Sequence, residues 1–278
     1  MRKISTYINN IICPVYAAFV ILSCTFYGWH IIVFIISYSN LDENVILRRL
    51  SIWMTWQPWI LLIFALVAIS VFLLRSHFLR ILFLNNKFFL RHWYAQILIV
   101  LMGLSNIYLY QLEYYIHLFN LLGISLSIYA SVLIAFQIYH SDVLAWRHPT
   151  TIGSSVVSTF ILGISVVILS GLFEDVLEIP VFWYIILILF DMFIFIARFR
   201  YLSVATATTR LFAKKLMGSL LLFTGIRLII GIFMPLVYSV YMIISKQDFG
   251  QGIALMIFIG QIVDRSLFLC NPIQRIDL

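Results

Sequence analysis

Long apolar runs of roughly membrane-spanning length follow one another along almost the whole of this chain. Hydrophobic residues make up 63% of its 278 residues, and charged residues make up only 10%. A soluble domain of this size could not hide so much apolar surface, because its exterior needs far more polar coverage. The pattern predicts an all-α, polytopic integral membrane helix bundle that forms a single domain over residues 1–278.

Eight of these runs are long enough to cross a bilayer. A hydrocarbon core of about 30 Å needs about 20 mostly apolar residues in a helix. The runs are continuous rather than alternating, which favours helices over the strands of a barrel. The first run follows a basic start without a cleavage pattern, so we expect a retained first span. The predicted spans are Ile11–Ser39, Trp53–Leu74, Tyr94–Gln111, His117–Tyr139, Ile152–Phe173, Pro180–Ala197, Met217–Ser245 and Gly252–Cys270.

The basic residues are unevenly shared among the connections between these spans. With the N-terminal segment numbered zero, thirteen Lys and Arg fall in even-numbered connections and three in odd-numbered ones. The positive-inside rule then predicts that the even-numbered connections and both termini face the cytoplasm of a bacterial inner membrane. This topology accounts for the net charge of +7 without a nucleic-acid partner. The thirteen are Arg2, Lys3, Arg75, Arg80, Lys87, Arg91, Arg147, Arg198, Arg200, Arg210, Lys214, Lys215 and Arg275, and the three are Arg48, Arg49 and Lys246.

Two basic connections, Arg75–Trp93 and Arg198–Leu216, are long enough for an amphipathic turn on the membrane surface. A docking site for an acidic partner is the alternative reading of the same pattern.

Tryptophans near the predicted span ends are typical of an interfacial belt. They are Trp53, Trp56, Trp59, Trp93, Trp146 and Trp183.

Four ionisable residues fall inside predicted spans, where a charge is costly and is therefore a candidate functional group. They are Asp191, Arg227, Asp264 and Arg265. Asp191 is expected either to line a polar seam or to pair with Arg227. Gln261 and Arg265 share a helix face because they are four residues apart. A structural Arg–Asp network between the last two spans and a ligand site are both compatible with this pattern.

Histidines and cysteines give little sign of a prosthetic group. A b-type haem needs two imidazoles that face each other between helices, and only His30 and His117 lie near spans. Isolated hydrogen-bonded histidines are the better interpretation, so no haem or metal is predicted. Cys13, Cys24 and Cys270 lack a C-x-x-C spacing and are expected to be small buried residues. The motifs of soluble nucleotide-binding and hydrolytic enzymes are missing from the sequence.

Three segments resemble one known family. They are LLRSHFLRILFLNNKFFLRHWYAQIL after the second span, IYHSDVLAWRHPTTIGSSVVSTFILG around the start of the fifth, and FIGQIVDRSLFL in the last. Their order and spacing are similar to those of the membrane anchor subunit of dimethyl sulfoxide reductase-type molybdoenzymes. The third segment matches a Gly-acid-x-x-Gly-Arg-x-x-Phe signature of that family.

The resemblance implies an eight-helix anchor that attaches an iron–sulfur subunit and a molybdopterin catalytic subunit to the membrane. It also implies that electrons from menaquinol pass to the iron–sulfur clusters in anaerobic respiration. Carried over by position, Arg80 matches the family's quinol-site arginine, Arg265 matches the arginine of the last-helix signature, and Arg227 matches one in the seventh span.

The chain departs from the family where quinol oxidation needs a proton acceptor. Gln96 stands for a glutamate at the start of the third span, and Gln261 stands for the acid of the last-helix signature. An amide cannot accept the proton that a carboxylate or histidine would take. His77 and Asp264 are the substitutes we consider. The quinol-binding candidates are therefore Arg80, His77, Gln96, Arg227, Gln261, Asp264 and Arg265.

The family's quinol-site loop lies on the face that binds the catalytic subunits, whereas the charge rule places the matching loop of this chain in the cytoplasm.

Two other function classes also remain open. One is a small secondary transporter, although repeat symmetry is not evident and Pro235 is the one proline well inside a predicted span. The other is a membrane scaffold without quinol chemistry, which the missing glutamate makes credible.

Overall fold

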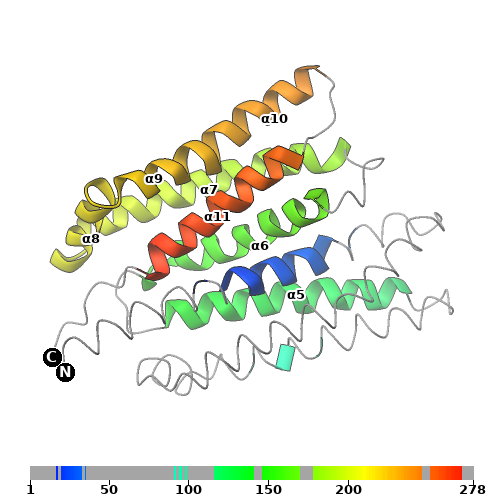
Figure 1. Cartoon of the computed structure of the whole chain (residues 1–278). Helices are drawn as coiled ribbons and strands as arrows, with labels where there is room; N and C mark the ends of the chain where they lie inside the picture. Colours follow the sequence, from blue (N-terminus) through cyan, green and yellow to red (C-terminus); the bar gives the residue numbers. More distant parts are fainter. Residues whose placement is uncertain are drawn as a thin grey trace.

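The structure is a computed structural model in which the regular elements of the described residues are all helices, as the apolar runs predict. Figure 1 shows them lying side by side with their long axes in similar directions. The described residues are 17, 20–32, 35, 91, 94, 95, 98, 116–140, 146–169, 178–245 and 251–270. The helices are α5 (Ile116–Tyr139), α6 (Pro149–Leu169), α7 (Glu178–Val204), α8 (Ala207–Met217), α9 (Leu221–Leu228), the π-helix η5 (Ile229–Phe233), α10 (Met234–Ser245) and α11 (Gln251–Cys270), preceded by the shorter apolar helix Val20–Ile32.

Within these residues, four stretches are long and apolar enough to cross a membrane. They are Leu121–Tyr139, Pro149–Leu169, Leu221–Ser245 and Gln251–Leu269. Helix α7 is 27 residues long but falls outside this set. It carries Asp191, Arg198 and Arg200, and the side chains of Asp191 and Arg198 are buried within the bundle. The predicted span Trp53–Leu74 and most of Tyr94–Gln111 lie outside the described residues, so the total of eight spans stays a prediction.

Helix α6 lies between several others and organises the bundle. It packs against α5, α7 and α11, and α11 in turn packs against α9, η5 and α10. Helix Val20–Ile32 crosses α6 where Gly28 meets Gly163, and a Cβ atom on either glycine would overlap the backbone of the other helix. Small residues at helix crossings allow such close approach, which membrane bundles commonly use.

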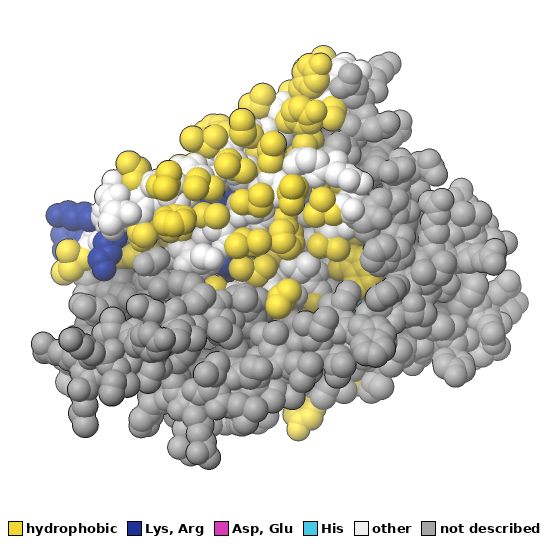
Figure 2. Space-filling view, viewed as in Figure 1, with side chains coloured by type: hydrophobic (Ala, Val, Ile, Leu, Met, Phe, Trp, Pro, Cys, Tyr) yellow, Lys and Arg dark blue, Asp and Glu magenta, His cyan; other side chains and the backbone are white. Residues whose placement is uncertain are grey.

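The outer face of α9, η5 and α10 is apolar along its length. Figure 2 shows yellow side chains spread over this face, with basic side chains at the end that α8 occupies. Leu222, Val237 and Ile244 are 71%, 66% and 77% exposed, values that a soluble monomer would avoid along a whole helix face. Contact with lipid would cover this surface, so the fold is compatible with the membrane protein that the composition predicts.

The connection after α7 forms a short amphipathic helix, as its sequence predicts. Thr209, Phe212, Ala213 and Leu216 are buried, and their spacing of three and four residues places them on one face of α8. The exposed positions include three basic residues, Arg210, Lys214 and Lys215. The Thr206 side chain accepts from the backbone N–H of Thr209 and the Thr209 hydroxyl accepts from that of Thr206, which fixes the start of the helix.

The predicted seventh span, Met217–Ser245, is interrupted rather than uniform. Residues 229–233 form a π-helix, and Pro235 follows two residues later. A proline inside a helix removes a backbone donor and clashes with the carbonyl four residues earlier, here that of Gly231. The wider π-turn accommodates that clash, and such turns are frequent at functional sites. Gly231 also packs against Gly260, because an added Cβ would lie 2.7 Å from the Gly260 Cα atom.

Two sequence-based placements are wrong. Helix α7 ends at Val204 rather than at Ala197, because Arg198 is 4% exposed and faces the bundle instead of lying in a solvated connection. Trp146 is 3% exposed, so it is a buried residue and not part of an interfacial belt. Trp183 is 57% exposed near the start of α7, as expected for the belt.

Candidate functional site: a buried arginine-rich network

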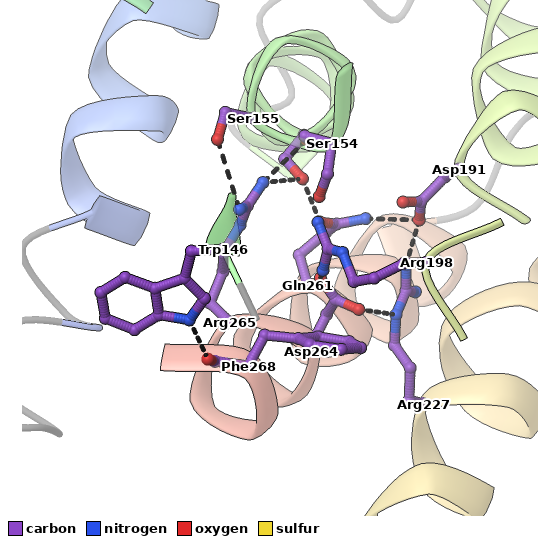
Figure 3. A network of polar contacts seen from close by, with 11 residues as sticks. Trp146, Ser154, Ser155, Asp191, Arg198, Arg227, Gln261, Asp264, Arg265 and Phe268 are labelled. Atoms are coloured by element: carbon purple, nitrogen blue, oxygen red, sulfur yellow. Dashed lines mark hydrogen bonds and ion pairs between the residues drawn. The ribbon is translucent and has the colours of Figure 1, made fainter. Parts of the chain in front are cut away.

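Nine polar side chains from four helices meet in one buried cluster, which we call the polar network (Figure 3). Each is at most 4% exposed. They are Ser154, Ser155 and Ser158 from α6, Asp191 and Arg198 from α7, Arg227 from α9, and Gln261, Asp264 and Arg265 from α11.

Arg227 joins the two carboxylates of the polar network. Its Nη2 donates to Asp191 Oδ2, and its Nε donates to Asp264 Oδ1 at 3.2 Å. The planar guanidinium suits two acceptors on different edges, which an ammonium group would serve less well. The contact that the sequence suggested between Asp191 and Arg227 is therefore present, and Arg227 ties α9 to both α7 and α11.

Arg227 also contacts the interrupted part of its own helix. Because Pro235 has no N–H, it cannot donate to the carbonyl of Gly231. Arg227 Nη1 donates to that carbonyl at 3.4 Å instead. The same side chain thus serves two buried carboxylates and a carbonyl that the proline leaves without its usual helical donor.

Gln261 connects Asp191 to α6. Its Nε2 donates to Asp191 Oδ2 at 2.8 Å, and its Oε1 accepts from Ser158 Oγ at 2.7 Å. Both ends of the amide are used, one as donor and one as acceptor, so an acid of similar size would not reproduce this pair of bonds at neutral pH. The amide at this position is chemically matched to its neighbours.

Arg265 is bound by neutral oxygens of α6. Its Nη2 donates to the Ser154 carbonyl and to Ser158 Oγ, each at 2.7 Å, and its Nη1 lies 3.5 Å from Ser155 Oγ. Among the residues that the structure describes, no carboxylate lies within ion-pair distance of Arg265. This arginine is therefore a buried positive charge whose described partners carry no negative charge.

Arg198 completes the polar network at the α8 end of the bundle. Its Nη1 lies 3.7 Å from Asp264 Oδ2, and its guanidinium stacks 4.2 Å above the centre of the Phe268 ring. The Phe268 carbonyl accepts a hydrogen bond from Trp146 Nε1 at 2.7 Å. A cation over an aromatic face is attracted by the ring quadrupole, which partly compensates for the lost water.

The polar network contains four of the seven residues that the sequence marks as quinol-binding candidates. These are Arg227, Gln261, Asp264 and Arg265. The other three, Arg80, His77 and Gln96, lie outside the described residues.

Sequence reasoning missed Arg198 and the serines of α6. Arg198 follows Asp191 by seven residues, two helical turns, and so shares its face. Ser154, Ser155 and Ser158 are likewise spaced for one face of α6. Both spacings are present in the sequence and place these residues on the same helix faces as the other polar residues of the network.

The arrangement favours binding and positioning over proton transfer. Asp264 contacts Arg227 at 3.2 Å and Arg198 at 3.7 Å, so a proton on it would leave two buried cations without their shared counter-ion. Asp191 is similarly engaged by Arg227 and Gln261. The contacts of Asp264 with two arginines make it a poor proton acceptor for a quinol.

Outside the polar network, two histidines make local contacts and one cysteine is buried. His30 is buried, and its Nδ1 lies 2.8 Å from the Phe26 carbonyl, so this nitrogen is the donor. His148 stacks on Tyr201, and partial burial together with the nearby Arg198 charge lowers the pKa of His148 below its usual range. Cys24 is buried as expected for a small core residue. Across the described part of the chain, no three His, Cys, Asp or Glu side chains gather as metal ligands would.

Comparison with known proteins assigns no family to this chain. No family matches its sequence, no curated protein is similar to it, and no solved structure matches its fold. Any functional assignment therefore depends on the residues and their geometry.

Proposed function

We propose that this chain is the membrane anchor subunit of a dimethyl sulfoxide reductase-type molybdopterin oxidoreductase. In this role it docks an iron–sulfur subunit and a catalytic subunit on the bacterial inner membrane and passes electrons from menaquinol to them. The observation that carries the proposal is the convergence of residues that the resemblance selects. Arg227 of the seventh span and Gln261 and Arg265 of the last-helix signature all lie in the polar network.

The last-helix signature also gains a physical explanation under this proposal. The family's acid is Gln261 here, while an acid occupies position 264, where the family has glycine. Positions three apart on a helix are neighbours, so the carboxylate has moved by less than one turn on the same face. Asp264 still faces the arginines, contacting both Arg227 and Arg198. The segment thus still contains one carboxylate, at position 264 instead of position 261.

The proposal separates docking from quinol chemistry. Quinol oxidation gives up two electrons and two protons, and the protons need an acceptor near the quinol. Asp264 is held by two arginines, so we assign this role to a residue outside the polar network, with His77 as the candidate. If His77→Ala left menaquinol-dependent reduction of the complex unchanged, His77 would be excluded.

The assembly is tested by affinity purification of the tagged full-length chain from its native membranes in mild detergent. The proposal predicts recovery of stoichiometric iron and molybdenum, together with a ferredoxin-like and a molybdopterin-containing polypeptide. Recovery of the chain alone, or with polypeptides that contain neither metal, would contradict it.

A small secondary transporter is the second candidate, and the interrupted helix favours it. Transporters place discontinuous helices and ionisable residues near a central site. Here η5 begins two residues after Arg227, which pairs with Asp191. Uptake of a solute by proteoliposomes that contain only this chain would support the transporter, and the metal analysis above would then find neither metal.

A further inference from the structure

The polar network carries more positive than negative charge. Three arginines (Arg198, Arg227 and Arg265) face two aspartates (Asp191 and Asp264), so the described residues of this buried cluster have a net charge of +1. Arg227 uses both carboxylates, and Arg198 shares one of them. The surplus charge is therefore associated with Arg265, whose hydrogen-bond acceptors are serine hydroxyls and a carbonyl.

Two donors in this region are also unused. The Nε atoms of Arg198 and Arg265 are shielded from solvent and have no hydrogen-bond partner within the part of the chain that the structure describes. Both side chains are more than nine-tenths buried, at 4% and 3% exposure. Leaving a charged donor without partner and without water is unfavourable, so two such atoms in one cluster indicate that a further acceptor belongs here.

The position of these arginines suggests where such an acceptor comes from. Arg265 precedes the end of α11 at Cys270 by five residues, a depth of about 8 Å at 1.5 Å per residue. The same end of the bundle carries α8, whose Phe212 packs against Phe268 with ring centres 6.0 Å apart. Helix α11 is 20 residues long, about 30 Å, which matches the thickness of a hydrocarbon core. Arg265 therefore lies in the outer half of the layer that the helix can span, on the side of the bundle that carries α8.

We propose that Arg265 and Arg198 form a binding site for a single oxyanion, a phosphate or carboxylate group, at the α8 end of the polar network. The anion neutralises the surplus charge and accepts from the unused Nε donors, as guanidinium groups commonly bind such oxygens. Its source is either the headgroup of an anionic lipid or a free anion. This site shares Arg265 with the quinol-binding candidates but does not rest on electron transfer, because a neutral quinol cannot supply the missing negative charge.

The test is the thermal unfolding midpoint of the purified full-length chain at constant ionic strength. One arm replaces chloride by inorganic phosphate in an uncharged detergent. The other adds phosphatidylglycerol, with phosphatidylcholine as the reference. A ligand that binds the folded state raises the midpoint as its concentration rises. We expect a saturable rise of several degrees in at least one arm, and the responding arm identifies the source of the anion.

The variants decide whether the response arises at this site. Arg265→Gln should abolish the rise, and Arg265→Lys, which retains the charge but lacks the forked donors, should need at least tenfold more anion. Arg210→Gln removes an equal charge from the exposed face of α8 and should respond like the wild type. A response that is absent from the wild type, retained in Arg265→Gln or lost in Arg210→Gln would overturn the proposal. Should Arg265→Gln not fold, the comparison of Arg265→Lys with Arg210→Gln decides in the same way.

Discussion

Arg227 joins its own helix to two others. It contacts Asp191 on α7 and Asp264 on α11 and also reaches the Gly231 carbonyl. Its exposure is 0%. A buried ion pair adds little compared with a well-packed apolar pair, but removing one partner leaves the other as an uncompensated charge.

Replacing Arg227 with glutamine should therefore be strongly destabilising. The change leaves two buried carboxylates without their shared cation, and we expect a loss of about 3–5 kcal/mol. The free energy of unfolding in mixed micelles is the measurement, with Arg210→Gln on the exposed face of α8 as the control for charge removal. Equal stability of the two variants would show that the Arg227 contacts do not stabilise the fold.

His148 gives a pH dependence whose sign can be stated. Its pKa is lower in the folded protein than the ordinary 6.5, because partial burial and the Arg198 charge disfavour the imidazolium. The unfolded chain therefore binds the proton more readily, and the contribution of His148 to stability is full above pH 6.5 and falls below it. Between about pH 7.5 and pH 5.5, the unfolding midpoint of the wild type should fall more than that of His148→Gln. Identical pH profiles would contradict this.

Among the helices, close crossings at glycine set the spacing of the bundle. Gly163 of α6 lies against the Gly28 backbone with no room for a Cβ atom. Gly163→Ala should therefore force the helices apart and destabilise the fold by about 1–3 kcal/mol. Gly225→Ala is the matched control, because a Cβ at Gly225 meets nothing within 4 Å and alanine favours a helix. Equal unfolding midpoints for the two variants would remove the steric argument.

Helix α8 is attached to the bundle through one aromatic contact in particular. Phe212 is 2% exposed and packs against Phe268, the ring on which Arg198 stacks. Phe212→Ala should increase amide hydrogen exchange throughout α8 and loosen Arg198. Leu211→Ala, at a neighbouring position that is 59% exposed, should leave the exchange unchanged. Rapid exchange of α8 in the wild type would mean that the helix is not docked.

The helices differ in how far their sequences determine their bounds. Helices α5 and α11 begin within one residue of the prediction and end as predicted, because each apolar run is closed by polar residues. The end of α7 could not be found from hydropathy, since Arg198 is buried through Asp264 and Phe268, partners that are distant in sequence. Pro235 is visible in the sequence as a proline inside a span, but the close approach of Gly231 in the π-turn to Gly260 of α11 is a contact between helices that hydropathy does not show.

At the scale of the whole molecule, the distribution of charge makes a topological prediction. The connection that contains α8 is even-numbered and basic, so it should face the cytoplasm, whereas the far end of α10 should face the opposite side. Single cysteines at Lys214 and Ser245 would report this. A membrane-impermeant maleimide should label Lys214→Cys only in inside-out vesicles and Ser245→Cys only in intact spheroplasts. Labelling of both from one side would contradict the crossing of α9, η5 and α10.

The sequence identified the membrane class and most of the ionisable members of the polar network, because charges stand out in apolar runs. It did not reveal how they are connected. Arg265 could not be assigned to the serines of α6 without the crossing of α6 and α11, and serines in apolar helices commonly bond only to their own backbone. The surplus positive charge became visible only when Arg198 was found to be buried.

The proposed transfer of electrons from menaquinol through this chain to an iron–sulfur partner would be seen in the reduction state of that partner. Reduced menaquinol is added to the complex purified through this chain, and the iron–sulfur signals are followed by electron paramagnetic resonance. We predict that the clusters become reduced in the complex and remain oxidised in the iron–sulfur and catalytic subunits prepared without the chain. Equal reduction in both preparations, or none in either, would contradict it.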